Sequence, residues 1–197
     1  MFKKNNRKFT RFMWAYIILI LLLAFTQLYS QTAVQFDGTN DYVTFGQATS
    51  TLGAQSFTVE CWFQRTGTGV GTTTGTGGFA GTTFVPIVTK GRGESEGSNL
   101  DMNYVLGIRN TDNVLAADFE EDNLSATSGL NHPIVGTTVL QNNVWYHAAV
   151  TYNLSDGYLR LYLNGNLESS VLVGTTRWPE YSSLQHTGLG TAMNSSG

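Results

Sequence analysis

An acidic cluster lies in the stretch ADFEED, which continues a run of residues typical of a strand. Asp118 and Glu120 are two residues apart, so they share one face of that strand, and Asp122 follows close behind. Ca²⁺ binds roughly six to eight oxygen atoms from carboxylates, carbonyls and water. We therefore predict a calcium site at Asp118, Glu120 and Asp122, with Asn123 nearby. The alternative is an acidic strand end that faces water.

The same pair of carboxylates also suits a hydrolase. Glycoside hydrolases use two carboxylates about 5 to 10 Å apart, and residues i and i+2 of a strand lie at about that spacing. Asp118 and Glu120 form such a pair within ADFEED. A carbohydrate-active enzyme is therefore the alternative to a binding protein.

Aromatic side chains supply a second kind of candidate site, because rings stack on sugar faces while nearby polar groups fix the orientation of the sugar. Two tryptophans lie in strand-like runs, where core packing is the alternative to ligand binding. Another lies before Pro179 in the loop-like stretch TTRWPEYSS, where a large ring has less reason to be covered. The predicted ligand contacts are Trp178, Tyr181, Trp62 and Trp145.

Two short motifs are interpreted as loops. Gly75, Gly77 and Ala80 fit G-x-G-x-x-A, but no helix follows them, as a dinucleotide site requires. Ser95 lies in a G-x-S-x-G match that no helical pattern follows, although a nucleophile elbow needs one. The Gly-rich stretch 66–83 has few large apolar side chains, so we predict a long flexible loop that does not join the core.

The first 30 residues have the composition of a secretory signal peptide. Five basic residues between positions 3 and 11 precede an apolar run from Met13 to Phe25. This run is shorter than the roughly 20 apolar residues of a spanning helix. We predict a leader helix that is removed near Ser30. The rest of the chain then has no stable membrane span and is secreted or held at the cell surface.

Residues 31–197 carry a formal charge of −8, because they contain all 14 Asp and Glu residues but only six of the 11 Lys and Arg residues. Nucleic acid is a poor partner for this charge. Calcium, glycans or an extracellular protein surface suit it better. Cys61 is the one cysteine, so it forms no intrachain disulfide, and we predict a buried, inert thiol.

Strand signals dominate residues 31–197, and no helix is predicted there. In VWYHAAVTY apolar positions alternate with a second set, which gives the strand two different faces. Asn164-Gly165 is a dipeptide of tight hairpin turns, so residues 144–174 are predicted to form a three-stranded meander. Many short strands favour an all-β sandwich or barrel. The predicted strands are 33–38, 41–46, 56–65, 84–91, 102–109, 113–120, 144–152, 158–165 and 169–174.

Four segments together resemble the laminin G-like or pentraxin-like jelly roll of the concanavalin A-like lectin/glucanase superfamily. The resemblance implies a two-sheet antiparallel jelly-roll sandwich over residues 31–197. It also implies that an acidic residue at a strand end binds calcium, and Asp118 matches that position best. The glucanase pattern E-x-D-x-x-E is absent. The four segments are VQFDGTNDYVTF, SFTVECWFQR, VWYHAAVTYNLSDGYLRLYLNG and HTGLGTAMNSSG.

Members of that family usually finish with a strand of the form G-x-(I/L)-D-E-V-R-(I/V), whereas this chain ends at MNSSG. The resemblance therefore implies that the domain lacks its last strand or strands and that further domains follow it. The predicted function is an exported, non-catalytic recognition or adhesion module for a glycan or a protein surface, with calcium as an expected cofactor. A glycoside hydrolase of the same fold and a structural spacer domain are the alternatives.

Overall fold

The computed structural model describes residues 33–75, 78–81, 83–94, 100–125 and 127–197. The chain divides into a unit ending at Gln35 and a unit spanning Phe36–Gly197, and the second contains all the elements named here. Two short helices are α2 (Thr49–Leu52) and η2 (Gly78–Gly81). The strands are β1 (Val43–Thr44), β2 (Phe57–Gln64), β3 (Phe84–Lys90), β4 (Tyr104–Arg109), β5 (Val114–Asp118), β6 (Ile134–Val139), β7 (Trp145–Asn153), β8 (Tyr158–Leu163), β9 (Asn166–Leu172) and β10 (Thr187–Leu189).

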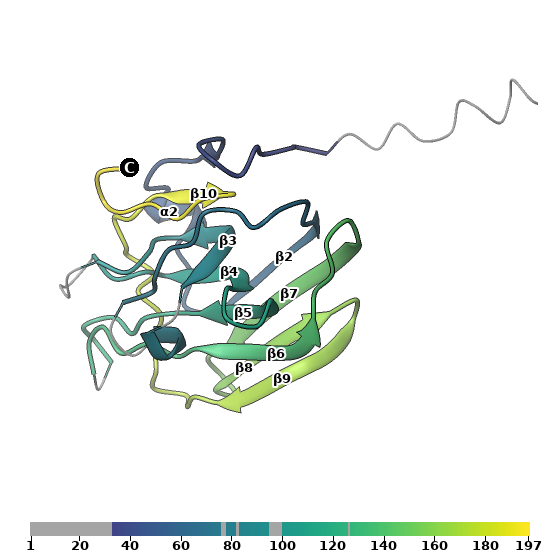
Figure 1. Ribbon diagram of the computed structural model, residues 1–197. Helices are drawn as coiled ribbons and strands as arrows, with labels where there is room; N and C mark the ends of the chain where they lie inside the picture. The colour runs from purple at the N-terminus through teal and green to yellow at the C-terminus, as the bar shows by residue number, and fades with distance from the viewer. Residues whose placement is uncertain (1–32, 76–77, 82, 95–99, 126) are drawn as a thin grey trace, which may run out of the picture. The chain divides into compact units, whose positions relative to one another are not determined.

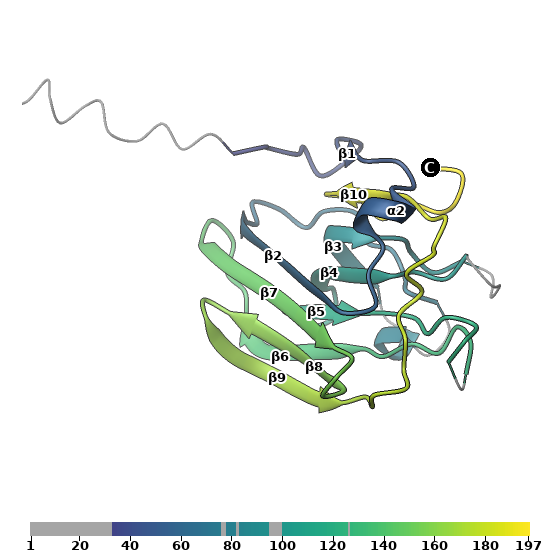
Figure 2. The same cartoon turned by 180° about the vertical axis from the view of Figure 1, so that it is seen from behind.

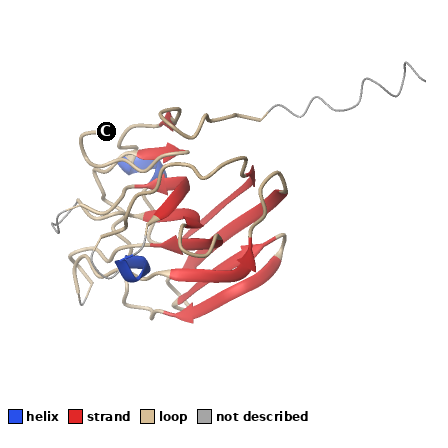
Figure 3. Cartoon of the chain, viewed as in Figure 1, coloured by secondary structure: helices blue, strands red, loops and turns tan. Residues whose placement is uncertain are grey.

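Two antiparallel sheets make up the second unit (Figure 1). The six-stranded sheet has the order β1-β10-β3-β4-β5-β6, and the four-stranded sheet has the order β2-β7-β8-β9. Figure 3 shows how little helix accompanies them. The predicted all-β, two-sheet sandwich is confirmed. The predicted leader helix over residues 1–30 lies outside the described residues. In the part of the chain that the structure covers, no helix has the length and apolar character needed to cross a membrane.

The core lies between the two sheets, which face each other in Figures 1 and 2. Strand β8 places Leu159, Leu161 and Leu163 in it, and β7 adds Val150 and Tyr152, as the alternation predicts. Burying one such aliphatic side chain stabilises the fold by about 1.5–3 kcal/mol. The six-stranded sheet covers the other side of the core with Tyr104, Leu106, Ile108, Leu115, Ala117 and Phe119.

The predicted meander is confirmed. Strand β7 pairs with β8, and β8 pairs with β9, all antiparallel. Asn164 and Gly165 have φ values of 50° and 77°, so both occupy the left-handed region that a two-residue hairpin turn of this type requires. The turn therefore fixes which β8 residues face the core.

One strand prediction is wrong, and two strands of the structure were not predicted. Residues 33–38 form no strand. Strand β6 was not predicted, because Pro133 precedes it and Gly136 interrupts its short apolar run. Strand β10 was not predicted either. It has three residues and is held by pairing with β1 on one side and β3 on the other, so its stability depends on partners distant in the sequence.

The Gly-rich stretch joins the structure more closely than predicted. Thr72 pairs with Phe84 in an isolated bridge, and η2 follows. Phe79 of η2 is only 2% exposed, because its ring packs against that of Phe84 with the centroids 5.4 Å apart. A second apolar cluster of Phe79, Phe84, Met102, Val105 and Ala116 results. The stretch thus covers part of the outer face of the six-stranded sheet, and the prediction that it stays out of any core is wrong.

A carboxylate joins the edge strands of the two sheets. Glu168 of β9 accepts hydrogen bonds from the backbone N–H groups of Thr137 and Thr138 in β6, at 2.8 and 2.9 Å, and from both threonine hydroxyls. Partial burial raises the pKa of Glu168, but these hydrogen bonds outweigh it, so the pKa lies below its ordinary value. The Glu168 carboxylate therefore satisfies N–H groups of a strand that has no further neighbour in its sheet.

We expect Glu168→Ala to lower the free energy of unfolding by roughly 1 kcal/mol near neutral pH, because charge-assisted hydrogen bonds at a partly exposed site are lost. Since the pKa of Glu168 is lowered in the folded state, its contribution is present above the unfolded pKa and disappears as the pH falls through the folded pKa. Urea unfolding of the two proteins at pH values from about 3 to 7 tests this. A difference that stays constant over that range would contradict it.

Candidate functional site

The outer face of the four-stranded sheet carries exposed aromatic side chains. In β2 and β7, the residues that alternate with the core positions point away from the core. Among them Trp62 is 67% exposed and Trp145 is 46% exposed. Trp62 and Gln64 are two residues apart on β2 and therefore share a face. Trp145 is the cross-strand partner of Gln64, so both tryptophan rings lie on that face. This surface, here called the aromatic face, consists of Glu60, Trp62, Trp145, His147, Tyr158, Arg160 and Tyr162.

Polar groups lie directly beside the rings. His147 is the cross-strand partner of Trp62, with the ring centroids 5.4 Å apart, and its Nε2 atom is 3.7 Å from a carboxylate oxygen of Glu60. The Arg160 guanidinium lies over the Tyr158 ring, 4.6 Å from its centroid. The face therefore combines flat apolar rings with hydrogen-bond donors and acceptors, the combination that fits a sugar ring and its hydroxyl groups.

The other two predicted ligand residues lie elsewhere. The Trp178 side chain is half-buried, and its backbone N–H donates to Ser125 Oγ at 2.8 Å while its carbonyl accepts from the N–H of Asp122. Tyr181 is 37% exposed and lines a pocket beside α2. The structure therefore brings Trp62 and Trp145 together on one face, with Trp178 and Tyr181 in a separate segment.

The three predicted calcium ligands have different surroundings, and all are buried. Glu120 accepts hydrogen bonds from Met102 N at 2.6 Å and from Asn131 Nδ2 at 3.1 Å. Asp122 holds the next turn, because its Oδ1 atom accepts from the N–H groups of the residues two and three positions on. Within the described ranges, no group of three or more His, Cys, Asp or Glu side chains is arranged to hold a metal ion.

Asp118 instead converges with oxygens of uncharged residues. A methyl group added at Gly78 would lie 2.8 Å from Asp118 Oδ2, 2.7 Å from Asn131 Oδ1 and 1.9 Å from Thr74 Oγ1. Three side-chain oxygens from separate segments thus meet around one point, where only glycine leaves room. Among the residues that the structure describes, neither Asp118 oxygen has a hydrogen-bond partner of regular geometry.

The electrostatics of this cluster favour a cation. Burial raises the pKa of Asp118 well above its ordinary value, and the nearby Thr74 hydroxyl and the backbone at His132 and Phe119 offset this only in part. An ionised carboxylate in such surroundings is costly unless a positive charge accompanies it. Carboxylate, amide and hydroxyl oxygens are the ligand types that Ca²⁺ takes. Asp118, Thr74 and Asn131 therefore fit a calcium ion.

A buried ionic group that the sequence did not reveal lies at the end of the core. Glu121 is fully buried, and its Oε1 atom is 2.6 Å from His132 Nε2 and 3.1 Å from Arg177 Nη1. Burial lowers the pKa of His132, while Glu121 partly opposes the shift. The Tyr152 hydroxyl oxygen lies 2.8 and 2.6 Å from the backbone carbonyl oxygens of Gly174 and Arg177, which share its single O–H donor. These contacts fix the chain after β9 against the core.

Two motif residues considered in the sequence, Gly77 and Ser95, lie outside the described residues. The two carboxylates considered for hydrolysis lie within the described residues, and both are buried: Asp118 is 1% exposed and Glu120 is 2% exposed. Neither carboxylate has the access that a polysaccharide would need.

Comparison with known proteins supplies a family and a fold. A family model described as the concanavalin A-like lectin/glucanases superfamily, of the laminin G type, matches residues 37–196. No curated protein matches the chain. Solved structures match at low identity. The IT-sialidase CBM40 of Ruminococcus gnavus bound to α2,6-sialyllactose has a TM-score of 0.52 at 11% identity, over 79% of this chain and 81% of that one.

Two further solved structures are similar to parts of the chain. Another structure of the same CBM40 has a TM-score of 0.50 at 13% identity, over 74% of this chain and 70% of that one. The SAP-like pentraxin of Limulus polyphemus has a TM-score of 0.40 at 15% identity, over 71% of this chain and 53% of that one. At these identities, the first two matches support the jelly-roll fold of the chain and nothing finer.

We expect Asp118→Asn to stabilise the protein in a chelating buffer, by about 1 kcal/mol or more near pH 8, because it removes a buried charge. The folded-state pKa of Asp118 is raised, so this carboxyl group favours folding at low pH and ceases to do so as the pH rises through that pKa. The advantage of the variant should therefore shrink towards about pH 4. Chemical unfolding in EDTA measures it. A variant less stable than the parent at high pH would contradict this account.

Proposed function

Because the chain belongs to the concanavalin A-like lectin/glucanases superfamily, we propose that it is a non-catalytic carbohydrate-binding module that holds glycans against the aromatic face. Stacking on Trp62 and Trp145 supplies the apolar contact. Glu60, His147 and Arg160 supply hydrogen bonds to sugar hydroxyls. The glycan stays chemically unchanged.

The exposure of Trp62 is the observation that carries this proposal. A large ring left in water on a regular strand forgoes a burial free energy on the order of 2 kcal/mol, and tryptophan is highly buried on average. Trp145 is a second exposed tryptophan on the same face, and the ionisable side chains of Glu60 and His147 lie beside Trp62. This combination indicates a ligand that makes both stacking and polar contacts. Sugars have that dual character.

Hydrolysis is left out of the proposed function because a polysaccharide could not reach Asp118 and Glu120. Both carboxylates are buried beneath the Gly-rich stretch, and Glu120 accepts a hydrogen bond from Met102 N. The two CBM40 structures that resemble this chain are carbohydrate-binding modules, which supports a binding role. A spacer domain would have no need of exposed tryptophans.

The proposed setting is outside the cell, as a recognition or adhesion unit of a longer protein, with glycans or extracellular surfaces as partners. The basic and apolar leader in residues 1–30 and the charge of −8 that follows it support this setting. The same negative charge makes nucleic acid a poor partner.

Binding to polysaccharides should depend on the aromatic face. We expect Trp62→Ala to weaken binding roughly fivefold to tenfold, because one stacking contact of about 1 kcal/mol is lost. Trp145→Ala should have a similar effect. A glycan array identifies the ligand, and calorimetry on the strongest hit measures the affinity.

Tyr42→Ala provides the matched control, since Tyr42 is an exposed aromatic residue that lies on neither β2 nor β7. It should leave the affinity unchanged. Equal affinities for the parent and for both tryptophan variants would overturn the proposal, as would turnover of the bound polysaccharide in a reducing-end assay.

A second proposal concerns calcium. We propose that Asp118, Asn131 and Thr74 bind one Ca²⁺ ion, supported by the convergence of their oxygens and by the buried charge of Asp118. A bound ion would offset the negative charge of the buried Asp118 carboxylate. It would also join the Gly-rich stretch, which contains Thr74, and the segment before β6, which contains Asn131, to the end of β5 at Asp118.

Calcium should raise the thermal midpoint of the parent protein, by an amount that grows with the free Ca²⁺ concentration. Asp118→Asn should abolish this response. Asp156→Asn, which changes an exposed turn carboxylate, should retain it. Differential scanning calorimetry with and without EDTA, together with titration of the apoprotein with Ca²⁺, makes the measurement. A parent protein that shows neither heat of binding nor a thermal shift has no such site.

A further inference from the structure

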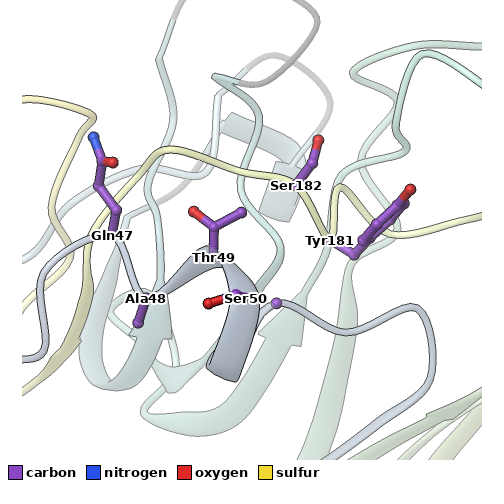
Figure 4. A pocket seen from close by; sticks show the side chains of 7 residues that line it. Gln47, Ala48, Thr49, Ser50, Tyr181 and Ser182 are labelled. Atoms are coloured by element: carbon purple, nitrogen blue, oxygen red, sulfur yellow. The ribbon is translucent and has the colours of Figure 1, made fainter.

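A polar pocket lies between α2 and the segment that follows β9 (Figure 4). Its volume is about 630 Å³, within the range of small-molecule sites. Gln47, Thr49 and Ser50 line it from one side, and Tyr181 and Ser182 line it from the other. None of these residues belongs to the aromatic face, so the pocket is a separate feature of the molecule.

The two walls of this pocket are tied together by a buried ammonium group. Lys90 is fully buried, and its Nζ atom donates to the carbonyl of Gln47 at 2.5 Å and to that of Ser183 at 3.0 Å. It also donates to Gln185 O at 3.1 Å. The Thr49 hydroxyl adds a direct bond between the walls, to Ser183 O at 3.2 Å.

Backbone contact fixes the spacing of the walls as well. A methyl group added at Gly53 would lie 1.9 Å from the carbonyl oxygen of Tyr181, so the two chains touch where only glycine fits. Beyond Gly53, the side chain of Asn103 bonds both the N–H and the carbonyl of Ala54, at 2.8 and 2.9 Å. The pocket is therefore preformed, and a ligand does not have to order its walls.

The lining favours a ligand that is neutral and rich in hydroxyl groups. All the described side chains that line the pocket are uncharged. The Thr49 hydroxyl donates to Ser183 O, and the Ser182 hydroxyl donates to the Glu180 carboxylate, so each has its lone pairs left for a ligand. These two hydroxyls can therefore accept hydrogen bonds from sugar hydroxyls, while Gln47 and Ser50 can donate in return. The Lys90 ammonium and the Glu180 carboxylate both lie behind the wall and offset each other, so no net charge there favours an ionic ligand.

We propose that this pocket binds one residue of a neutral sugar, with the Tyr181 ring stacked on the sugar and with Gln47, Thr49 and Ser182 bonded to its hydroxyls. The site goes beyond the function proposed for the aromatic face and does not depend on it. A glycan long enough to reach both would be held at two points.

The test uses free monosaccharides with the ¹⁵N-labelled protein. We expect D-galactose or D-glucose, titrated to about 50 mM because single-sugar sites are weak, to shift the amide signals of Gln47, Thr49, Ser50 and Ser182. N-acetylneuraminic acid should leave them in place. Tyr181→Ala should weaken the response roughly fivefold or more, while Tyr181→Phe should keep it, because the ring is retained.

Trp62→Ala distinguishes the two sites. It should leave the pocket signals responsive to monosaccharide even though it weakens polysaccharide binding, so failure of one proposal is separable from failure of the other. The pocket proposal is overturned if neither neutral sugar shifts these signals, if the charged sugar shifts them equally, or if Tyr181→Ala responds like the parent. The Tyr181 side chain is partly exposed, and an unchanged amide spectrum elsewhere will verify that each variant is folded.

Discussion

The register between β2 and β7 is the constraint on which the rest of this sandwich depends. Eight consecutive residue pairs, from Phe57 opposite Tyr152 to Gln64 opposite Trp145, join the two strands. Side chains alternate along a strand, so a shift of one residue would turn the core residues to solvent and the tryptophans inward. The same pairing thus decides what the four-stranded sheet buries and what it presents to a ligand.

The two sheets treat their outer faces in opposite ways. The six-stranded sheet is overlaid by the Gly-rich stretch, with Phe79 packed on Phe84 and Asp118 enclosed beneath. The four-stranded sheet leaves its rings open to water. The enclosed Asp118 on one side and the uncovered tryptophans on the other agree with the proposed division of roles, in which one face would bind a calcium ion and the other a glycan.

Local patterns in the sequence predicted a large part of this structure. Alternation gave the inward and outward residues of β7 and β8, and Asn164-Gly165 gave the turn beyond them. Contacts between distant segments were out of reach. Phe79 joins a core only because Phe84 and Met102 meet it, and β10 exists only between β1 and β3. Spacing likewise grouped Asp118 with Asp122, whereas folding brings Asp118 to Thr74 and Asn131.

The Glu168 contact has a bearing on how the molecule keeps apart from its own kind. Unpaired strand edges invite lateral addition of other chains, and natural sheets protect such edges with charge. Here one carboxylate occupies the N–H groups of Thr137 and Thr138 and also places a negative charge at that rim. Acidification neutralises this charge and weakens the hydrogen bonds that depend on it. Association through the β6 edge is therefore expected to follow the protonation of Glu168.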